Sequence, residues 1–249
     1  MPAKLRLDLL LVERGLAPSR EQAQALILAG AILVNGQKAT KPGHAVAADA
    51  ELTRVGEPLR FASRAGLKLE AALDHFHLDA AGRVALDVGS STGGFTDCLL
   101  QRGARRVHAV DSGTNQMIWR LRTDPRVHLL EKTNARFLTA RDLKLERGEE
   151  PDLLTLDVSF ISATLLLPTL VKLLRRPAEV VVLVKPQFEA GRAAVGKGGV
   201  VRDAAARQAA VERVAQALEG LGARAIATIP SPILGAHGNQ EFLLHAVIE

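Results

Sequence analysis

Residues 84–96 read VALDVGSSTGGFT, an apolar, strand-like run followed by a glycine-rich turn and the first residues of a helix. Gly89 and Gly93 allow the backbone of the turn to approach a ligand closely, because glycine has no side chain. The glycines lack the G-x-G-x-x-G spacing of dinucleotide-binding loops, and no Lys-Ser or Lys-Thr pair follows as in a phosphate-binding loop. The turn therefore indicates a ligand site in which a dinucleotide is less favoured and a Walker-type phosphate loop is excluded.

An acidic residue ends the next apolar run, 107–110. Asp111 lies 22 residues beyond Gly89, where a carboxylate can accept hydrogen bonds from ribose hydroxyls. Loop, helix and distal acid in this register match the S-adenosylmethionine sites of doubly wound methyltransferases, and the alternative is a tight turn that binds nothing. The residues expected to hold the cofactor are Asp87, Gly89, Ser91, Gly93, Gly94 and Asp111. Asp87 either orients the amino group of the cofactor or only caps the loop.

Short apolar runs alternate with helical patterns through residues 65–249. The runs that suit buried parallel strands are 84–88, 107–110, 127–130, 153–156 and 180–184. Residues 203–221 predict the clearest helix, and 224–229 and 241–248 predict two last strands. This alternation predicts an α/β fold, a doubly wound, Rossmann-like sheet with ligands at the carboxyl ends of its strands.

Residues 4–57 predict a separate, small α+β unit. Its expected elements are two short helices ending at Gly15 and Gly30, strands at 32–34 and 51–55, and a hairpin turn at Asn35-Gly36. Ser19 is expected to cap the second helix. A Gly-Glu-Pro linker at 56–58 then predicts one domain at 1–58, a linker at 59–64 and a second domain at 65–249.

The composition limits the class of protein. With 249 residues, 47% of them hydrophobic, the chain is not a disordered one. Cys98 is the single cysteine, which excludes internal disulfides and cysteine-based zinc sites, and the histidine spacing suggests no metal. The N-terminus lacks a signal peptide, and the apolar stretch 153–174 carries Asp157 and Lys172, so we expect a soluble cytoplasmic protein.

Four ionisable residues stand where a doubly wound fold places its chemistry. Asp157 and Lys185 each follow a buried strand directly, Glu241 opens the last strand, and Lys68 lies in the segment SRAGLKL at 63–69. Taken singly, Lys68 is equally well an exposed helical lysine, and Glu241 an ordinary acid at a strand end.

The pattern LRLDLLLV…SREQAQALI…GAILVNGQK…KPG resembles the S-four-type RNA-binding domain of ribosomal proteins and pseudouridine synthases. Nearly the whole chain resembles the TlyA-type ribosomal RNA 2′-O-methyltransferases, also named hemolysin A. The stretches that carry this resemblance include SRAGLKL, LDVGSSTGGFTDCLL, TLDVSFIS, LVKPQFEAGR, VGKGGVVRD and SPILGAHGNQEFLL. The chain departs from the family at 112–117, which read SGTNQM where the family commonly has V-G-x-G-Q-L.

The resemblance implies a function and a mechanism. The enzyme would methylate a ribose 2′-hydroxyl of ribosomal RNA, usually on a cytidine, with S-adenosylmethionine. The Lys-Asp-Lys-Glu tetrad of FtsJ-type enzymes would be Lys68, Asp157, Lys185 and Glu241. We assign Lys185 as the principal base, Asp157 as the residue that orients Lys185 and the hydroxyl, and Lys68 with Glu241 as holding the ribose and a neighbouring phosphate.

The positive charge of the chain favours an anionic partner, for which we expect ribosomal RNA or a ribosomal subunit. The net charge is +5 and the pI about 9.7. The cations expected to contact RNA phosphates are Arg6, Arg20, Lys38 and Lys41 in the first domain and Arg192 and Lys197 in a glycine-rich loop; otherwise they are ordinary solvated surface. Two further alternatives are a non-catalytic ribosome-assembly factor and a membrane-active hemolysin, which the lack of a spanning segment disfavours.

Overall fold

The computed structural model describes residues 4–17, 19–28, 30–55, 60–145, 149–191 and 194–249. The chain divides into two compact units, Met1–Pro58 and Leu59–Glu249, and each has its own hydrophobic core. Of the expected linker, Phe61 is only 2% exposed and packs in the core of the second unit. Residues 60–64 therefore lie within the second unit, while Gly56-Glu57-Pro58 lie outside the described residues.

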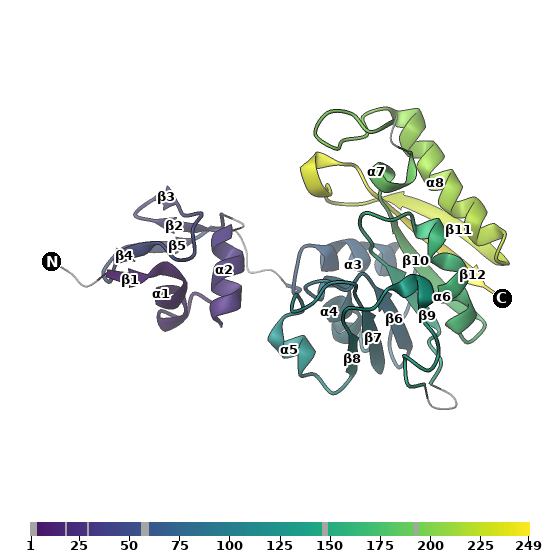
Figure 1. The fold of residues 1–249 in the computed structure, drawn as a ribbon, viewed down its shortest axis with the longest axis horizontal. Helices are drawn as coiled ribbons and strands as arrows, with labels where there is room; N and C mark the ends of the chain where they lie inside the picture. Colours follow the sequence, from purple (N-terminus) through teal and green to yellow (C-terminus); the bar gives the residue numbers. More distant parts are fainter. Residues whose placement is uncertain (1–3, 18, 29, 56–59, 146–148, 192–193) are drawn as a thin grey trace. The chain divides into compact units, whose positions relative to one another are not determined.

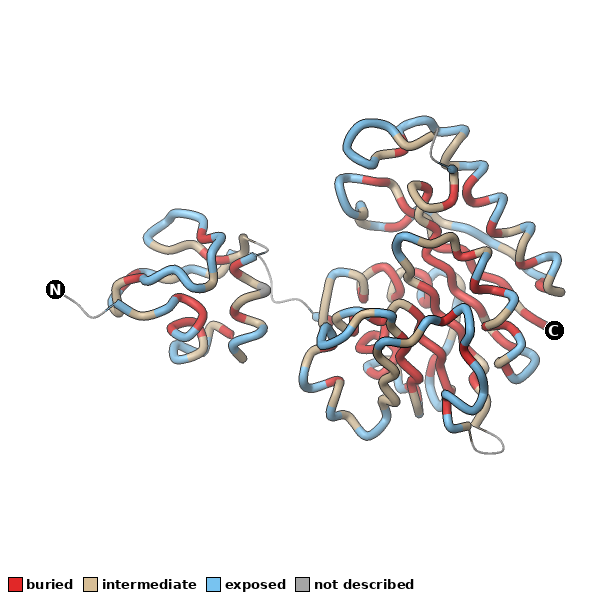
Figure 2. Tube along the Cα trace, viewed as in Figure 1, coloured by how far each residue is buried: buried red, intermediate tan, exposed pale blue. Residues whose placement is uncertain are grey.

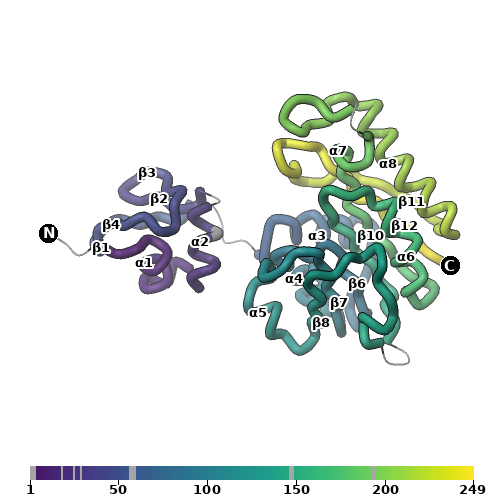
Figure 3. Tube along the Cα trace, in the orientation of Figure 1, coloured from purple at the N-terminus to yellow at the C-terminus, as the bar shows by residue number. Residues whose placement is uncertain are grey.

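The first unit is a small α+β fold, drawn in purple in Figures 1 and 3. Its elements are β1 (Lys4–Arg6), α1 (Leu7–Glu13), α2 (Arg20–Leu28), β2 (Ile32–Val34), β3 (Gln37–Lys38), β4 (Ala45–Ala47) and β5 (Leu52–Arg54). β1 pairs with β4, and β2 pairs with β3 and β5, all antiparallel. Both helices and the strands β2, β3 and β5 match the sequence-based expectation. β1 and β4 give no such signal, since three residues are too few to show strand periodicity.

Local signals in the first unit act as the sequence predicts. Asn35 and Gly36 both have positive φ angles, 49° and 75°, the backbone that a two-residue hairpin turn requires. The Gln22 amide donates to Ser19 Oγ at 3.3 Å, so Ser19 does cap α2.

The second unit is a seven-stranded sheet with helices on both faces. Its strands are β6 (Val84–Val88), β7 (Arg106–Val110), β8 (Val127–Leu130), β9 (Leu153–Leu156), β10 (Ala178–Val184), β11 (Ala223–Pro230) and β12 (Phe242–Ile248). The α-helices are α3 (Ala65–His75), α4 (Gly94–Gln101), α5 (Trp119–Arg122), α6 (Leu167–Leu170), α7 (Pro186–Glu189) and α8 (Ala204–Glu219). Short 3₁₀ turns are η1 (Ala135–Phe137), η2 (Ala163–Leu165), η3 (Val171–Leu173) and η5 (Ala236–Gly238).

The sheet has the order β11-β12-β10-β9-β6-β7-β8. β10, β9, β6, β7 and β8 pair in parallel, whereas β12 is antiparallel to both of its neighbours. The strand order reverses beside β6, which is where a doubly wound sheet opens a crevice for ligands at the carboxyl ends of its strands. The expected α/β class and all seven strands are thus confirmed.

Successive residues of the central strands face opposite sides of the sheet. Leu154, Leu156 and neighbours pack against α6 and α8, whereas Ala85, Leu153 and neighbours pack against α3 and α4. Figure 2 shows the central strands as nearly continuous buried segments. Burial on both faces explains why these strands read as mostly apolar runs, without the regular alternation of a half-buried strand. Among the described residues, no helix is long and apolar enough to cross a membrane.

Candidate active site

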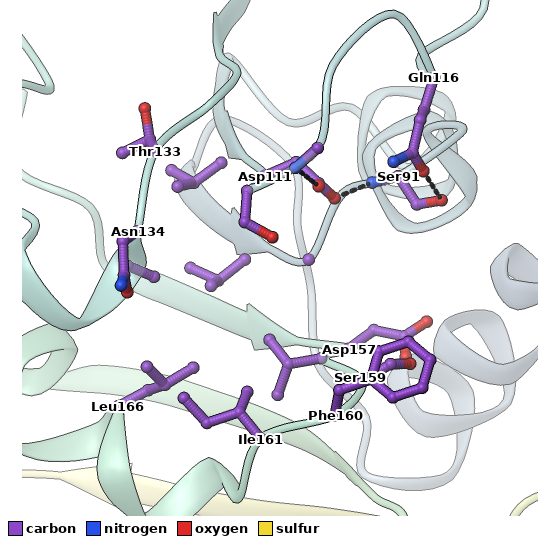
Figure 4. A pocket seen from close by; sticks show the side chains of 17 residues that line it. Ser91, Asp111, Gln116, Thr133, Asn134, Asp157, Ser159, Phe160, Ile161 and Leu166 are labelled. Carbon is purple, nitrogen blue, oxygen red and sulfur yellow. Dashed lines mark hydrogen bonds between the residues drawn. The ribbon is translucent and has the colours of Figure 1, made fainter.

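A cavity of about 510 Å³ opens at the carboxyl ends of β6, β7 and β9. Figure 4 shows it between the loop that follows Asp111 and the segment from Asp157 to Ile161. The residues that line it are Val88, Gly89, Ser91, Val110, Asp111, Ser112, Gly113, Gln116, Thr133, Asn134, Ala135, Asp157, Val158, Ser159, Phe160, Ile161 and Leu166. Its size lies in the range of small-molecule sites. The wall with Asp111 and Ser91 is polar, whereas the opposite wall combines Asp157 and Ser159 with Ile161 and Leu166 (Figure 4).

Asp111 organises the polar wall of the cavity. Its Oδ2 accepts a hydrogen bond from the Ser91 amide at 2.7 Å, and its Oδ1 accepts one from the Gly113 amide at 2.6 Å (Figure 4). The Ser91 hydroxyl donates to Gln116 Oε1 at 2.9 Å. Asp111 therefore ties the glycine-rich turn to the segment 112–117, in which this chain departs from the family pattern. Each carboxylate oxygen keeps a further lone pair for a ligand hydroxyl.

Gly89 is required by a close approach of two backbone segments. Its φ is +84°, and a Cβ at this position would lie 2.3 Å from the carbonyl oxygen of Asp157. Gly89 thereby lets the end of β6 lie against the segment that carries Asp157. Gly93 and Gly94 do not line the cavity, and their missing Cβ atoms make room for Leu121 and Ser63 instead. Their contribution to ligand binding is thus to shape the turn.

Asp87 lies beneath the turn, inside β6, and is fully buried. It accepts hydrogen bonds from Thr96 Oγ1 at 2.6 Å and from Thr155 Oγ1 at 3.0 Å. Burial raises the pKa of Asp87 to about 7, against the effect of these two hydroxyls. It does not line the cavity, and its contact with Thr96 of α4 fits the alternative that it supports the loop.

Lys185 and Asp157 form the first of two ion pairs near the cavity. Lys185 Nζ lies 2.6 Å from Asp157 Oδ1 and donates a hydrogen bond to Ser159 Oγ at 3.0 Å. The side chains are 11% and 16% exposed, so water competes little for them. Lys185 follows β10 and Asp157 follows β9, and the parallel register of these strands brings them to one edge.

Lys68 and Glu241 form the second pair. Lys68 Nζ lies 2.5 Å from Glu241 Oε2, and both side chains are buried. Lys68 projects from α3, which packs on the sheet, and Glu241 directly precedes β12. Val184 is paired with Phe242 in the antiparallel register, which sets Lys185 and Glu241 opposite each other at the next step. The fold thus gathers all four tetrad residues at one sheet edge, where they form two lysine–carboxylate ion pairs.

A buried carboxylate links the two segments that carry the first pair. Glu189, in α7, accepts hydrogen bonds from Ser162 Oγ at 2.5 Å and from the Ala163 amide at 2.7 Å. Burial raises its pKa. Ser162 follows the Asp157 segment and Glu189 follows Lys185, so this contact fixes one segment against the other. No pattern in the sequence indicates this role for Glu189.

Phe160 stands out on the rim of the cavity. It is 92% exposed, has a positive φ of 68°, and its ring lies 5.3 Å from that of Phe188. A positive φ is unfavourable for a bulky residue, and such strain persists where the surrounding structure holds it. The cavity residues that no sequence pattern indicated include Thr133, Asn134, Ile161 and Leu166. Thr133 and Asn134 follow the strand β8, which is the one signal that points to them.

In the first unit, Arg6 and Arg20 meet at the carboxylate of Asp8, which is fully buried. Arg6 donates to both oxygens of Asp8, at 3.0 and 2.9 Å, and Arg20 Nε and Gln24 Nε2 donate to Oδ2 at 3.0 and 2.9 Å. The Arg6 guanidinium holds the pKa of Asp8 well below its usual range. Both arginine side chains remain about half exposed, so Asp8 orients them without covering them.

The remaining expected RNA contacts lie on the surface. Lys38 and Lys41 are exposed in the first unit, and Lys197 is exposed in a turn closed by the bridge between Gly196 and Val200. Arg192 lies outside the described residues.

Cys98 is buried in the core of the second unit, where burial raises the pKa of its thiol to about 12. The described residues contain no cluster of side chains that could hold a metal ion.

Comparison with known proteins agrees with this geometry. The family model of FtsJ-like methyltransferases matches residues 61–247, and that of the S4 domain matches residues 5–52. The chain belongs to the FtsJ-like methyltransferases. YqxC of Bacillus subtilis is 49% identical over 244 residues, which cover 97% of this chain and 85% of YqxC. The 16S/23S rRNA (cytidine-2′-O)-methyltransferase TlyA of Mycobacterium tuberculosis is 46% identical, over 98% of this chain and 90% of TlyA.

A solved structure is similar to the whole chain. A Streptococcus thermophilus protein described as a hemolysin has a TM-score of 0.75 and 44% identity, and the match covers 100% of this chain and 90% of that one. An FtsJ-like methyltransferase takes its methyl group from S-adenosylmethionine. The cavity fits this cofactor, because Asp111 offers acceptors for ribose hydroxyls and the Gly89 turn lets the backbone come close.

Proposed function

We propose that this protein methylates a ribose 2′-hydroxyl of ribosomal RNA, with cytidine as the target nucleoside. The observation that carries the proposal is the pairing of Lys185 with Asp157 and of Lys68 with Glu241 at one sheet edge beside the cofactor cavity. A ribose hydroxyl is a weak nucleophile and must lose its proton as it attacks. TlyA, whose name states this reaction, is 46% identical over nearly the whole chain.

The bound cofactor supplies a methyl group on a positively charged sulfur, for displacement in line with the incoming oxygen. The chain's own residues position that oxygen and take its proton. Lys185 Nζ is the proposed acceptor, as the neutral amine that remains once its ammonium group has released a proton to solvent. Ser159 and Asp157 fix the direction of this group at 3.0 and 2.6 Å. Asp157 also lines the cavity, so its carboxylate could orient the attacking hydroxyl towards a cofactor bound there.

Lys68 and Glu241 are proposed to hold the ribose and the phosphate beside it. Both side chains of this ion pair are buried, so solvent screens their charges only weakly. In the cofactor cavity, Asp111, Gly89 and Ser91 are proposed as direct contacts, since these three line it. Asp87, Gly93 and Gly94 are proposed to act through the shape of the turn.

Phe160 and Phe188 suit the base of the target nucleotide. The exposed ring of Phe160, which lies beside Asp157 and Ser159 in the chain and contacts the half-buried Phe188, offers a stacking face. Base–aromatic stacking tolerates any base. The methylated hydroxyl must reach the cofactor, so we propose that the nucleotide is turned out of its helix onto this face.

The S4 domain is proposed to dock the protein on folded ribosomal RNA in the cytoplasm. Arg6 and Arg20, aimed by Asp8, and the exposed Lys38 and Lys41 would contact phosphates. Lys197, which is exposed, is proposed to add a further phosphate contact, and so is Arg192, which lies outside the described residues. In the double variant Lys38→Ala/Lys41→Ala, the slope of log K for RNA against log salt concentration should be smaller by roughly 1.4–1.8. This is the range for two phosphates of a single strand or of a duplex. An unchanged slope would show that these lysines do not face the RNA.

One assay tests the proposed reaction directly. The protein is incubated with labelled S-adenosylmethionine and with small subunits, large subunits or naked ribosomal RNA, and the modified nucleotide is then mapped. Label on a single cytidine 2′-oxygen, absent with Lys185→Ala, supports the proposal. Label on a base nitrogen or carbon contradicts it. RNA binding without any transfer would favour the assembly-factor alternative.

A further inference from the structure

A second cavity, of about 210 Å³, lies on the other side of the tetrad from the cofactor cavity. Its lining is Ser63, Arg64, Ala65, Lys68, Ile233, Leu234, Gly235 and Ala236. Asp157 lines the first cavity and Lys68 lines the second. The partners of these two residues, Lys185 and Glu241, stand opposite each other at the ends of β10 and β12. The two ion pairs therefore separate the two cavities.

The walls of the second cavity differ in chemistry. One wall holds the cations Arg64 and Lys68, and the other holds Ile233 and Leu234. Leu234 is 53% exposed, although it is a large aliphatic residue. The Lys68 charge is met by Glu241 at 2.5 Å. Arg64 is exposed, and within the described part of the chain no carboxylate lies within 4 Å of its guanidinium.

The shape of the second cavity depends on Gly235, which lines it. A Cβ on Gly235 would lie 2.0 Å from Glu241 Oε1, so the backbone of this loop rests directly on the Glu241 carboxylate. This contact keeps the aliphatic wall next to the buried ion pair. The cavity is thus an extension of the catalytic edge.

We propose that the second cavity binds the RNA nucleotide that flanks the target nucleotide in the same strand, with its phosphate on Arg64 and its base against Ile233 and Leu234. A guanidinium that has no carboxylate partner among the described residues matches a phosphodiester. An aliphatic wall can pack against the face of a base. This inference rests on the proposed function, because it needs an RNA strand that passes over the tetrad. It adds a subsite that would fix the register of the strand, so that one hydroxyl reaches the cofactor.

The test uses the full chain with naked ribosomal RNA and S-adenosylmethionine, at several potassium chloride concentrations. Arg64→Ala should lower kcat/KM for RNA about tenfold, mainly through KM, and should reduce its salt slope by about 0.7. Arg64→Lys should retain the salt slope, because a lysine keeps the charge. Leu234→Ala should lower kcat/KM about threefold with an unchanged slope. Arg224→Ala, an exposed arginine at the start of β11, is the matched control and should change neither.

Two outcomes would overturn the subsite. An unchanged kcat/KM and slope in Arg64→Ala would remove Arg64 from the RNA path. A loss that appears instead in the dissociation constant of S-adenosylmethionine would show that Arg64 acts through α3 on the cofactor cavity. If the wild-type protein transfers no methyl group, the proposed function fails. The same variants are then compared by anisotropy of a labelled RNA fragment, where an unchanged salt slope in Arg64→Ala would also overturn the subsite.

Discussion

Replacing Asp111 by alanine should weaken the binding of S-adenosylmethionine. Its carboxylate accepts the amides of Ser91 and Gly113 at 2.7 and 2.6 Å, and it faces the cavity with its remaining lone pairs. Hydrogen bonds to charged groups contribute about 1.5–3 kcal/mol each, and water that enters the variant recovers part of the loss. We therefore expect about 2–3 kcal/mol in total, which corresponds to about 30- to 150-fold in Kd.

Isothermal titration of the wild type and of Asp111→Ala with S-adenosylmethionine measures this change in Kd. Asp124→Ala is the control, because Asp124 is also an acid in a surface loop, paired with Arg126, and it does not line the cavity. RNA affinity should stay unchanged in both variants. An Asp111→Ala Kd equal to that of the wild type would refute the reasoning and would leave the ribose to another group.

A ligand analogue separates a direct contact from an effect on loop shape. The wild type should bind S-adenosylhomocysteine more tightly than its 2′-deoxy analogue, and this ratio should fall towards one in Asp111→Ala. If both ligands weaken equally and the ratio persists, Asp111 only fixes the turn through Ser91 and Gly113.

Three further predictions concern the catalytic edge and the core beneath it. Lys185→Ala should lower the rate of methyl transfer by ~10²–10⁴ with an unchanged cofactor Kd, and near-normal single-turnover rates would remove Lys185 from the mechanism. Glu189→Gln should keep nearly normal activity, since its amide group can form hydrogen bonds with both Ser162 and the Ala163 amide. Glu189→Ala should lower the free energy of urea unfolding by about 1–3 kcal/mol and should also lower kcat. An equal loss in both variants would instead indicate that the charge of Glu189 matters. For Asp87, a folded-state pKa of about 7 exceeds the unfolded value, so the native state binds the extra proton and wild-type stability should fall from pH 4 to pH 7, by at most about 4 kcal/mol. Asp87→Asn should lack this dependence, and parallel stability profiles of the two proteins would contradict the assignment.

The strands of the second unit could be predicted because both faces of the sheet are covered. Val84–Val88 and Leu153–Leu156 each hold one polar residue in an otherwise apolar run, and they form β6 and β9 with these bounds. The short β1 and β4 have no such pattern, and they exist because the core of the first unit brings them together. The packing of Phe61 in the core of the second unit could not be predicted either. A single phenylalanine after a Gly-Glu-Pro linker does not indicate which residues it contacts.

The candidate site shows the same division between position and contact. Asp157, Lys185 and Glu241 could be placed by their strands, since strand ends meet at a sheet edge. The contact of Lys68 with Glu241 joins residues 173 positions apart and depends on how α3 packs, which no local pattern encodes. Asp8 and Glu189 were missed for the same reason, because each works through a buried contact between segments.

The buried charges of this sheet edge are explained by function and not by stability. Desolvating a lysine and a carboxylate costs several kcal/mol per ion, and their attraction seldom returns more than this cost. Lys68 and Glu241 are 11% and 2% exposed, so aliphatic side chains of similar size would serve stability equally well. Removing one partner alone leaves a buried charge, so loss of activity in Lys68→Ala would mix catalysis with folding. The pair Lys68→Met/Glu241→Leu removes both charges together, and a folded, cofactor-binding but inactive double variant is the outcome that this reasoning requires.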